Sequence, residues 1–154
     1  MDLFLVRHAV AEDGGDDFAR PVTKKGAKKF TQVARGLFAL ELPVTKVLHS
    51  PRLRAVQTAE LLAAPFDAPL EVVAELDGPP GEALLDELHG DGVALVGHEP
   101  HLSSLLAWLV TGDLKLGSAF ELKKGAVAWV SGEPRPGRMC LRALLPPAAS
   151  RAAR

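Results

Sequence analysis

Short apolar runs, each followed by polar or turn-forming residues, divide the chain into regularly spaced elements. Leu3–Val6 and Val93–Val96 are continuous apolar runs of four residues. Runs of this length without alternation are typical of strands buried on both faces of a parallel sheet. Further strands are predicted at 46–50, 70–73, 126–130 and 139–144.

Helical patterns occupy most of the intervals between these strands. From Ala27 to Phe38, apolar side chains recur at spacings of three and four, behind a predicted N-cap at Thr23. Further helices are predicted at 54–64, at 82–88 and from Pro100 onward. Strands that alternate with helices predict an α/β fold, a three-layer α/β/α sandwich around a mostly parallel central sheet.

The length of 154 residues fits one domain, and no internal repeat or long linker divides the chain. We expect this domain to span 1–145 and the Ala/Arg-rich tail, 146–154, to fray. The one cysteine, Cys140, cannot form a disulfide within the chain. It lies in a strand-like run, where we expect a small buried apolar residue rather than a reactive thiol.

Composition and charge limit the partners. Hydrophobic residues make up 47% and charged residues 24% of the chain, and the formal net charge is -1. The net charge of the chain therefore does not favour a nucleic acid or an anionic membrane as partner. Binding of an anion requires a local cluster of cations. No apolar stretch approaches the roughly 20 residues of a membrane span, and no signal peptide is visible. We expect a cytoplasmic protein.

Candidate chemistry gathers where three predicted strands end. Arg7-His8 follows the first strand, Ser50–Arg54 the second, and Gly97-His98-Glu99 the strand at 93–96. In open α/β sheets, sites form beyond the carboxyl ends of the strands. If these strands are parallel, two histidines and at least two arginines converge at one edge.

This combination points to a phosphoryl group. Arginine supplies charge and a planar fork of donors to phosphate, while an imidazole can act as nucleophile or donor. Neither of the common Gly-rich phosphate loops is present. The pair His98-x-x-His101 has the spacing of two metal ligands, but no further ligand pattern supports a metal site. We therefore expect neither a metal nor another cofactor.

Four segments carry a resemblance to a known family. They are Leu5-Val-Arg-His-Ala-Val-Ala, Arg20-Pro-Val-Thr-Lys-Lys-Gly26, Ser50-Pro-Arg-Leu-Arg-Ala-Val-Gln-Thr-Ala59 and Val96-Gly-His-Glu-Pro-His-Leu102. In order and spacing they resemble the histidine phosphatase superfamily, which has the fold of cofactor-dependent phosphoglycerate mutase. Within this superfamily, the chain resembles the SixA-type phosphohistidine phosphatases in being short.

The resemblance implies roles for four residues. His8 matches the nucleophile that becomes phosphorylated, and Arg7 matches the neighbouring arginine that holds phosphate. Arg54 matches the second phosphate-binding arginine, and His98 the second pocket histidine, which donates to the transferring oxygens. The chain departs from the family at Ala9, where many members have glycine, a change that we expect to be tolerated.

The acid that protonates the leaving group is open. Glu75 and Asp77 lie roughly where many members carry it but match no motif, and Glu99 beside His98 is a third candidate that could also bind substrate. Glu99 could equally be a carboxylate that stabilises a helix start. Without a clear acid, a phosphohistidine substrate is favoured over an alkyl phosphate, because an imidazole can leave without a strong acid.

The predicted activity is a metal-independent phosphatase that passes through a phosphohistidine on His8. A protein phosphohistidine is the favoured substrate, and a small phosphorylated metabolite or nucleotide is the alternative. A mutase is disfavoured by the length of the chain, and a non-catalytic phosphate-binding module by the full set of matching pocket residues. Arg52 is expected to be solvated, with contact to the substrate as the alternative, and Arg20 to brace the loop near the site.

Overall fold

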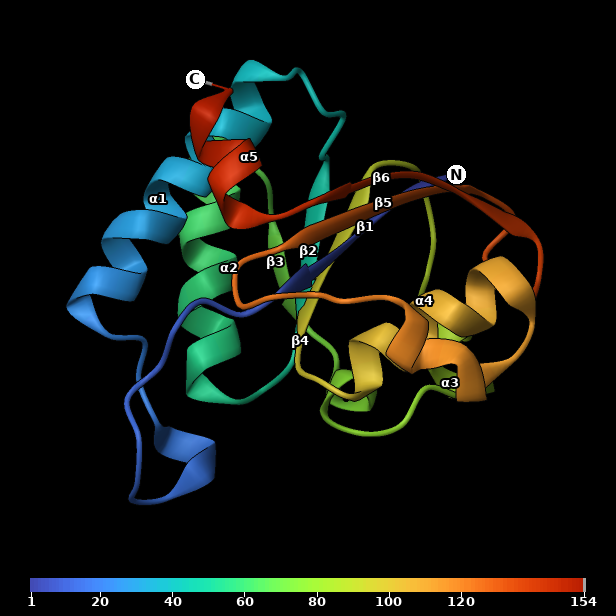
Figure 1. Ribbon diagram of the computed structural model, residues 1–154, viewed down its shortest axis with the longest axis horizontal. Helices are drawn as coiled ribbons and strands as arrows, with labels where there is room; N and C mark the ends of the chain where they lie inside the picture. Colours follow the sequence, from blue (N-terminus) through green and yellow to red (C-terminus); the bar gives the residue numbers. More distant parts are fainter. Residues whose placement is uncertain (154) are drawn as a thin grey trace.

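Six strands form one sheet in the computed structural model, which describes residues 1–153 (Figure 1). They are β1 (Asp2–Arg7), β2 (Lys46–His49), β3 (Leu70–Val72), β4 (Val93–Gly97), β5 (Val127–Gly132) and β6 (Met139–Leu145). Their order across the sheet is β3-β2-β4-β1-β5-β6. The first four are parallel, β5 runs antiparallel to β1, and β6 runs antiparallel to β5.

Helices cover both faces of this sheet (Figure 1). They are α1 (Lys24–Ala39), α2 (Leu53–Phe66), α3 (Glu82–Asp86), α4 (His101–Thr111) and α5 (Pro147–Ala152). Short 3-10 turns lie at Asp17–Ala19, Ala74–Asp77 and Leu114–Ala119. Helices α1, α2 and α5 cover one face, and α3 and α4 cover the other. The predicted three-layer sandwich with a mostly parallel sheet, of the phosphoglycerate mutase type, is confirmed.

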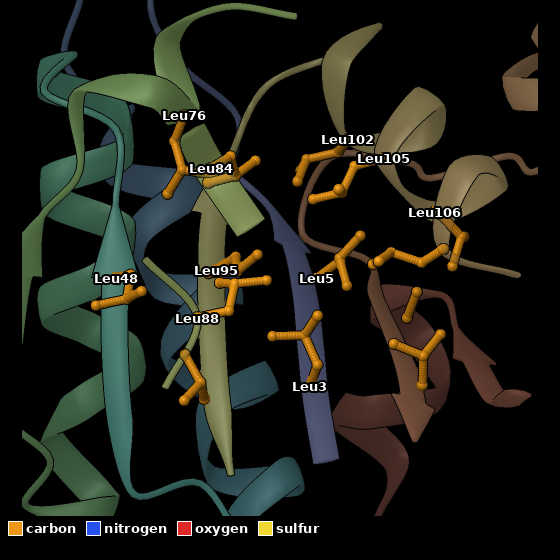
Figure 2. Close-up of a cluster of buried hydrophobic side chains, with 14 of the residues drawn as sticks. Leu3, Leu5, Leu48, Leu76, Leu84, Leu88, Leu95, Leu102, Leu105 and Leu106 are labelled. Atoms are coloured by element: carbon orange, nitrogen blue, oxygen red, sulfur yellow. The ribbon is translucent and has the colours of Figure 1, made fainter. Parts of the chain in front are cut away.

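The continuous apolar runs reflect burial on both faces. On β1, Leu3 and Leu5 pack into the cluster beneath α3 and α4, which Figure 2 shows with Leu102 and Leu105 of α4. Phe4 and Val6 point the other way, into a second cluster with α1 and α2. Since each residue of this strand meets a core, no position in its middle can be polar.

The described residues after β6 correct the expectation of a frayed tail at 146–154, of which Arg154 lies outside the described residues. Pro147–Ala152 form α5, and the side chain of Ser150 is fully buried against α1. A side chain on Gly36 of α1 would lie 1.6 Å from the backbone oxygen of Ser150. The helix therefore docks where α1 has no side chain, a long-range fit that an Ala/Arg-rich composition does not indicate.

Two local predictions have opposite outcomes. The N-cap at Thr23 is confirmed, because its Oγ1 accepts a hydrogen bond of 2.8 Å from the backbone N–H of Gly26. The expectation that Cys140 is buried is wrong. It lies on the edge strand β6, where Met139 faces the core and Cys140, on the opposite face, is exposed.

The sheet register brings three strand ends together. Arg7 of β1 pairs with Gly97 of β4, and His49 of β2 pairs with Val96 of β4. His8 directly follows β1 and His98 directly follows β4. Both residues therefore lie at the same edge of the sheet. Within residues 1–153, no helix has the length and apolar character needed to cross a bilayer.

Candidate active site

Two histidine rings face each other at this edge of the sheet. The ring centroids of His8 and His98 are 5.2 Å apart, and each side chain is 6% exposed. The first turn of α2 adds Arg54, which is equally buried. Arg7, at the end of β1, is half-buried. The structure thus places the four residues singled out from the sequence around one point.

Hydrogen bonding fixes the tautomer of His8. Its Nδ1 lies 2.7 Å from the carbonyl oxygen of Ala9, which can only accept, so Nδ1 carries the proton and Nε2 keeps its lone pair. Burial lowers the pKa of His8 to about 4, and the positive charges of Arg54 and Arg7 act in the same direction. The hydrogen bond to Ala9 offsets part of this shift. At neutral pH the ring is an uncharged nucleophile.

A hydroxyl that the sequence analysis did not single out holds this segment in place. Thr58 of α2 is fully buried, and its Oγ1 accepts a hydrogen bond of 3.0 Å from the backbone N–H of Ala9. The same hydroxyl donates to the carbonyl oxygen of Arg54 at 2.7 Å. It therefore links the backbone beside His8 to the first turns of α2. The only signal in the sequence was its place inside the segment 50–59.

His98 has its own orienting group. Ser50 Oγ lies 2.7 Å from His98 Nε2 and also accepts the backbone N–H of Arg52 at 3.3 Å. With the Ser50 hydroxyl assigned as the donor to Nε2, the ring proton of His98 is on Nδ1. Burial lowers the pKa of His98 to about 3, and the neighbouring charges of His8 and Arg54 contribute.

Three buried donors at this edge have no partner among the described residues. They are Nε of Arg7, Nε of Arg54 and Nδ1 of His98. Within residues 1–153, four buried side-chain N or O atoms lack a hydrogen-bond partner, and these are three of them. Buried polar groups are nearly always paired. Their concentration around His8 therefore indicates an external acceptor, and the two guanidinium groups require that acceptor to be an anion.

An acidic loop lies against the arginines. The carboxylate of Asp17 forms ion pairs with Arg20, Arg52 and Arg54. Its backbone oxygen accepts a hydrogen bond of 2.7 Å from Arg54 Nη1. The hydrogen bond from Arg20 is the main cause that lowers the pKa of Asp17. An internal carboxylate thus occupies guanidinium groups that could bind an oxyanion.

Arg52 lies in the site, as the alternative of a contact with the substrate required, and is not a freely solvated side chain. It pairs with both Asp17 and Asp77, and the hydrogen bond to Asp77 raises its pKa. With Arg54 and His98 it lines a cavity of about 180 Å³. No local pattern indicates these pairs, because the partners of Arg52 lie 35 and 25 residues away in the chain.

The three acid candidates differ in their surroundings. Both oxygens of Glu99 accept hydrogen bonds from Ser103, one from its backbone N–H at 2.8 Å, so this carboxylate caps α4 while lining the cavity. Asp77 lines the same cavity but is paired with Arg52. Glu75 is exposed and lies outside that cavity. None of them is an unpaired carboxyl beside His8.

Metal binding finds no support in the geometry. Among residues 1–153, no group of three His, Cys, Asp or Glu side chains is arranged to hold a metal ion. The spacing of His98 and His101 therefore has no third ligand in the described part of the chain. His101 instead forms the start of α4 and lines the cavity with His98.

Comparison with known proteins agrees with this geometry. The sequence profile of the histidine phosphatase superfamily (branch 1) matches residues 3–78. The phosphohistidine phosphatase SixA of Escherichia coli is 34% identical over 124 residues, which cover 73% of this chain and 76% of that protein.

Solved structures show the same fold. The protein histidine phosphatase SixA complexed with tungstate gives a TM-score of 0.80 at 28% identity and covers 96% of this chain and 98% of that one. The alpha-ribazole phosphatase of Shigella flexneri gives a TM-score of 0.72 at 19% identity and covers 96% and 97%, a likeness of fold alone. The chain belongs to the histidine phosphatase superfamily and is a SixA-like phosphatase, a hydrolase.

Proposed function

We propose that the chain is a phosphohistidine phosphatase that removes the phosphoryl group from a phosphorylated protein by way of a phosphohistidine on His8. The observation that carries the proposal is the set of three unpaired buried donors around a neutral, oriented His8. Such donors suit the equatorial oxygens of a phosphoryl group in transfer, because they are already in place when charge redistributes.

The proposed reaction has two displacements. Nε2 of His8 attacks phosphorus in line, a new N–P bond forms, and the bond from phosphorus to the substrate imidazole breaks. Arg7, Arg54 and His98 stabilise the oxygens, and the carbonyl of Ala9 stabilises the charge that His8 acquires. Water then attacks phosphorus, the bond to His8 breaks, and inorganic phosphate leaves. No step requires a metal.

The surroundings of the carboxylates favour phosphohistidine over a phosphate monoester. An alkoxide leaving group needs a proton, but Asp77 is held by Arg52 and Glu99 by Ser103. An imidazole leaving group needs less help, because it is far less basic. The similarity to SixA, which is named a phosphohistidine phosphatase, supports the same substrate class.

A small-molecule phosphomonoesterase is the second candidate. It is favoured by one observation, that Asp77 lines the same cavity as Arg54 and His98 and would be in reach of a leaving group once released from Arg52. The two candidates share the chemistry at His8 and differ only in what leaves phosphorus.

A substrate panel separates them. The purified protein is given phosphohistidine peptides, an aryl phosphate, sugar phosphates and nucleotides, with and without EDTA. We expect the highest kcat/KM with phosphohistidine and no effect of EDTA. Higher kcat/KM with a sugar phosphate or nucleotide would reject phosphohistidine as the preferred substrate.

The nucleophile is tested with a matched pair of variants. His8→Ala should abolish hydrolysis and the trapping of an acid-labile phosphoenzyme, whereas His89→Ala, at an exposed histidine away from the site, should keep both. Full turnover by His8→Ala would reject the mechanism, and a strict metal requirement would reject the proposed set of groups.

A further inference from the structure

A second cavity, apart from the one that Arg54 and His98 line, has Arg7 in its wall. It has a volume of about 420 Å³ and is bordered by α1, α5 and the turn that precedes β5. Five cations line it: Arg7, Lys29, Lys123, Lys124 and Arg151. We call it the basic cavity. Its volume lies in the range of sites that hold small molecules.

No carboxylate of residues 1–153 balances the charges of the basic cavity. None of its lining residues is acidic. Among residues 1–153, the only ion pairs are those of Arg20, Arg52 and Arg54, so no Asp or Glu side chain pairs with a cation of this cavity. Like charges gathered in a chain of net charge -1 repel one another, and a bound anion would relieve that repulsion.

The base of the basic cavity is apolar. It is formed in part by Phe30 and Val33 of α1, both buried in the core, and by Pro147 at the start of α5. A hydrated inorganic ion gains nothing from such a surface. A molecule with an apolar body and an anionic group can bury the body against α1 while the cations at the rim bind the charge.

We propose that the basic cavity binds a small amphipathic anion, an apolar ring or chain that bears a carboxylate, sulfonate or phosphate, and that this site is coupled to the phosphate site through Arg7. The proposal goes beyond the phosphatase activity. A concave shape with a largely apolar lining favours a small molecule over an acidic protein surface, which would meet the lysines on a flat or convex face.

The coupling follows from the position of the charges. Arg7 lines the basic cavity and also lies beside His8, and Lys124 is close enough to His8 to lower its pKa. An anion in the basic cavity would offset these positive charges at the phosphate site. It should therefore weaken the binding of an oxyanion there, and by linkage the oxyanion should weaken the binding of the amphipathic anion by the same factor.

The probe for the test is 8-anilinonaphthalene-1-sulfonate, which combines an aromatic body with one sulfonate and becomes fluorescent in apolar surroundings. We expect saturable binding of one molecule per chain at pH 7. Lys29→Glu should weaken binding at least fivefold. Lys28→Glu makes the same charge change on the exposed face of α1, outside the cavity, and should stay within twofold of the wild type.

A second variant tests the basic cavity independently, in case Lys29→Glu fails to fold. Val10 is 43% exposed and lines the basic cavity, so Val10→Trp should fill part of it and weaken binding without a change of charge. Equal affinity in wild type, Lys29→Glu and Val10→Trp would overturn the proposal, as would the lack of saturable binding. Binding of an acidic peptide but not of the probe would also overturn it, in favour of a protein partner.

Orthovanadate tests the coupling. Saturating orthovanadate should raise the Kd of the probe two- to tenfold and then have no further effect, because both sites can be occupied together. If the Kd of the probe instead rises in proportion to the orthovanadate concentration without reaching a plateau, the probe binds in the phosphate site and the proposal is overturned. His8→Ala should still bind the probe. Since binding is measured without turnover, failure here leaves the phosphatase assignment intact. If that assignment fails, the probe titrations of the wild type, Lys29→Glu and Val10→Trp still test the basic cavity.

Discussion

Acidification should destabilise this protein because two histidines are buried in the neutral form. Burial is the main cause that lowers the pKa of His8 to about 4 and that of His98 to about 3. In the unfolded chain, a histidine titrates near pH 6.5. Between pH 6.5 and the pKa values of the two histidines in the folded protein, the unfolded chain binds protons that the folded protein does not. The stability is therefore full above pH 6.5 and is lost as the pH falls through the folded pKa values.

The size of this loss follows from the pKa shifts. Each histidine contributes a slope of up to about 1.4 kcal/mol per pH unit in that window. From pH 7 to pH 5, the free energy of unfolding should fall by about 2 kcal/mol for each histidine, and by about 4 kcal/mol for the pair. That is a large fraction of the roughly 5–15 kcal/mol by which a domain is stable.

Urea unfolding at pH 7, 6 and 5 measures this loss. The variant His98→Asn should lose about 2 kcal/mol less than the wild type between pH 7 and pH 5, because asparagine does not titrate. His89→Asn removes an exposed histidine and serves as the control, with the slope of the wild type. If His98→Asn shows the same pH dependence as the wild type, the account of a buried neutral imidazole is refuted.

Three further predictions concern the site and the fold. Arg54→Lys keeps the charge but loses the planar fork, so kcat/KM for an aryl phosphate should fall by about 10²-fold; an unchanged value would exclude a phosphate-binding role. Asp17→Asn removes the carboxylate that pairs with Arg54 and Arg52, so inorganic phosphate should inhibit a few-fold more tightly, and weaker inhibition would contradict this. Gly36→Ala should lower the free energy of unfolding by about 1–3 kcal/mol in urea, because the new methyl group meets the backbone of α5. Gly78→Ala, where a side chain has open space, should stay within about 0.5 kcal/mol of the wild type.

Much of the fold could be read from local patterns. A strand such as β1 that meets a core on both faces must be apolar at every interior position, so the run Leu3–Val6 marks it directly. The helix from Lys24 to Ala39 was recognisable from its period and from its cap at Thr23. The convergence of His8 and His98 followed from topology, because parallel strands present their carboxyl ends at one edge.

Other parts of the site depended on distant contacts. The pairs of Arg52 with Asp17 and Asp77 join a helix start to two loops, and no periodicity links their positions. The hydroxyl of Thr58 looked like one polar residue in a helix until the structure placed it under the backbone of Ala9.

Local patterns were enough to predict the order of the elements, the two-sided burial of the strands and the residues that stand at their ends, because these depend on neighbours within a few positions. The docking of α5 on Gly36, the exposure of Cys140 and the gathering of five cations around the basic cavity became visible only in the folded molecule. Each of these depends on which surfaces meet after the chain has folded, and a contact between residues far apart in the chain leaves no period or local composition from which it could be read.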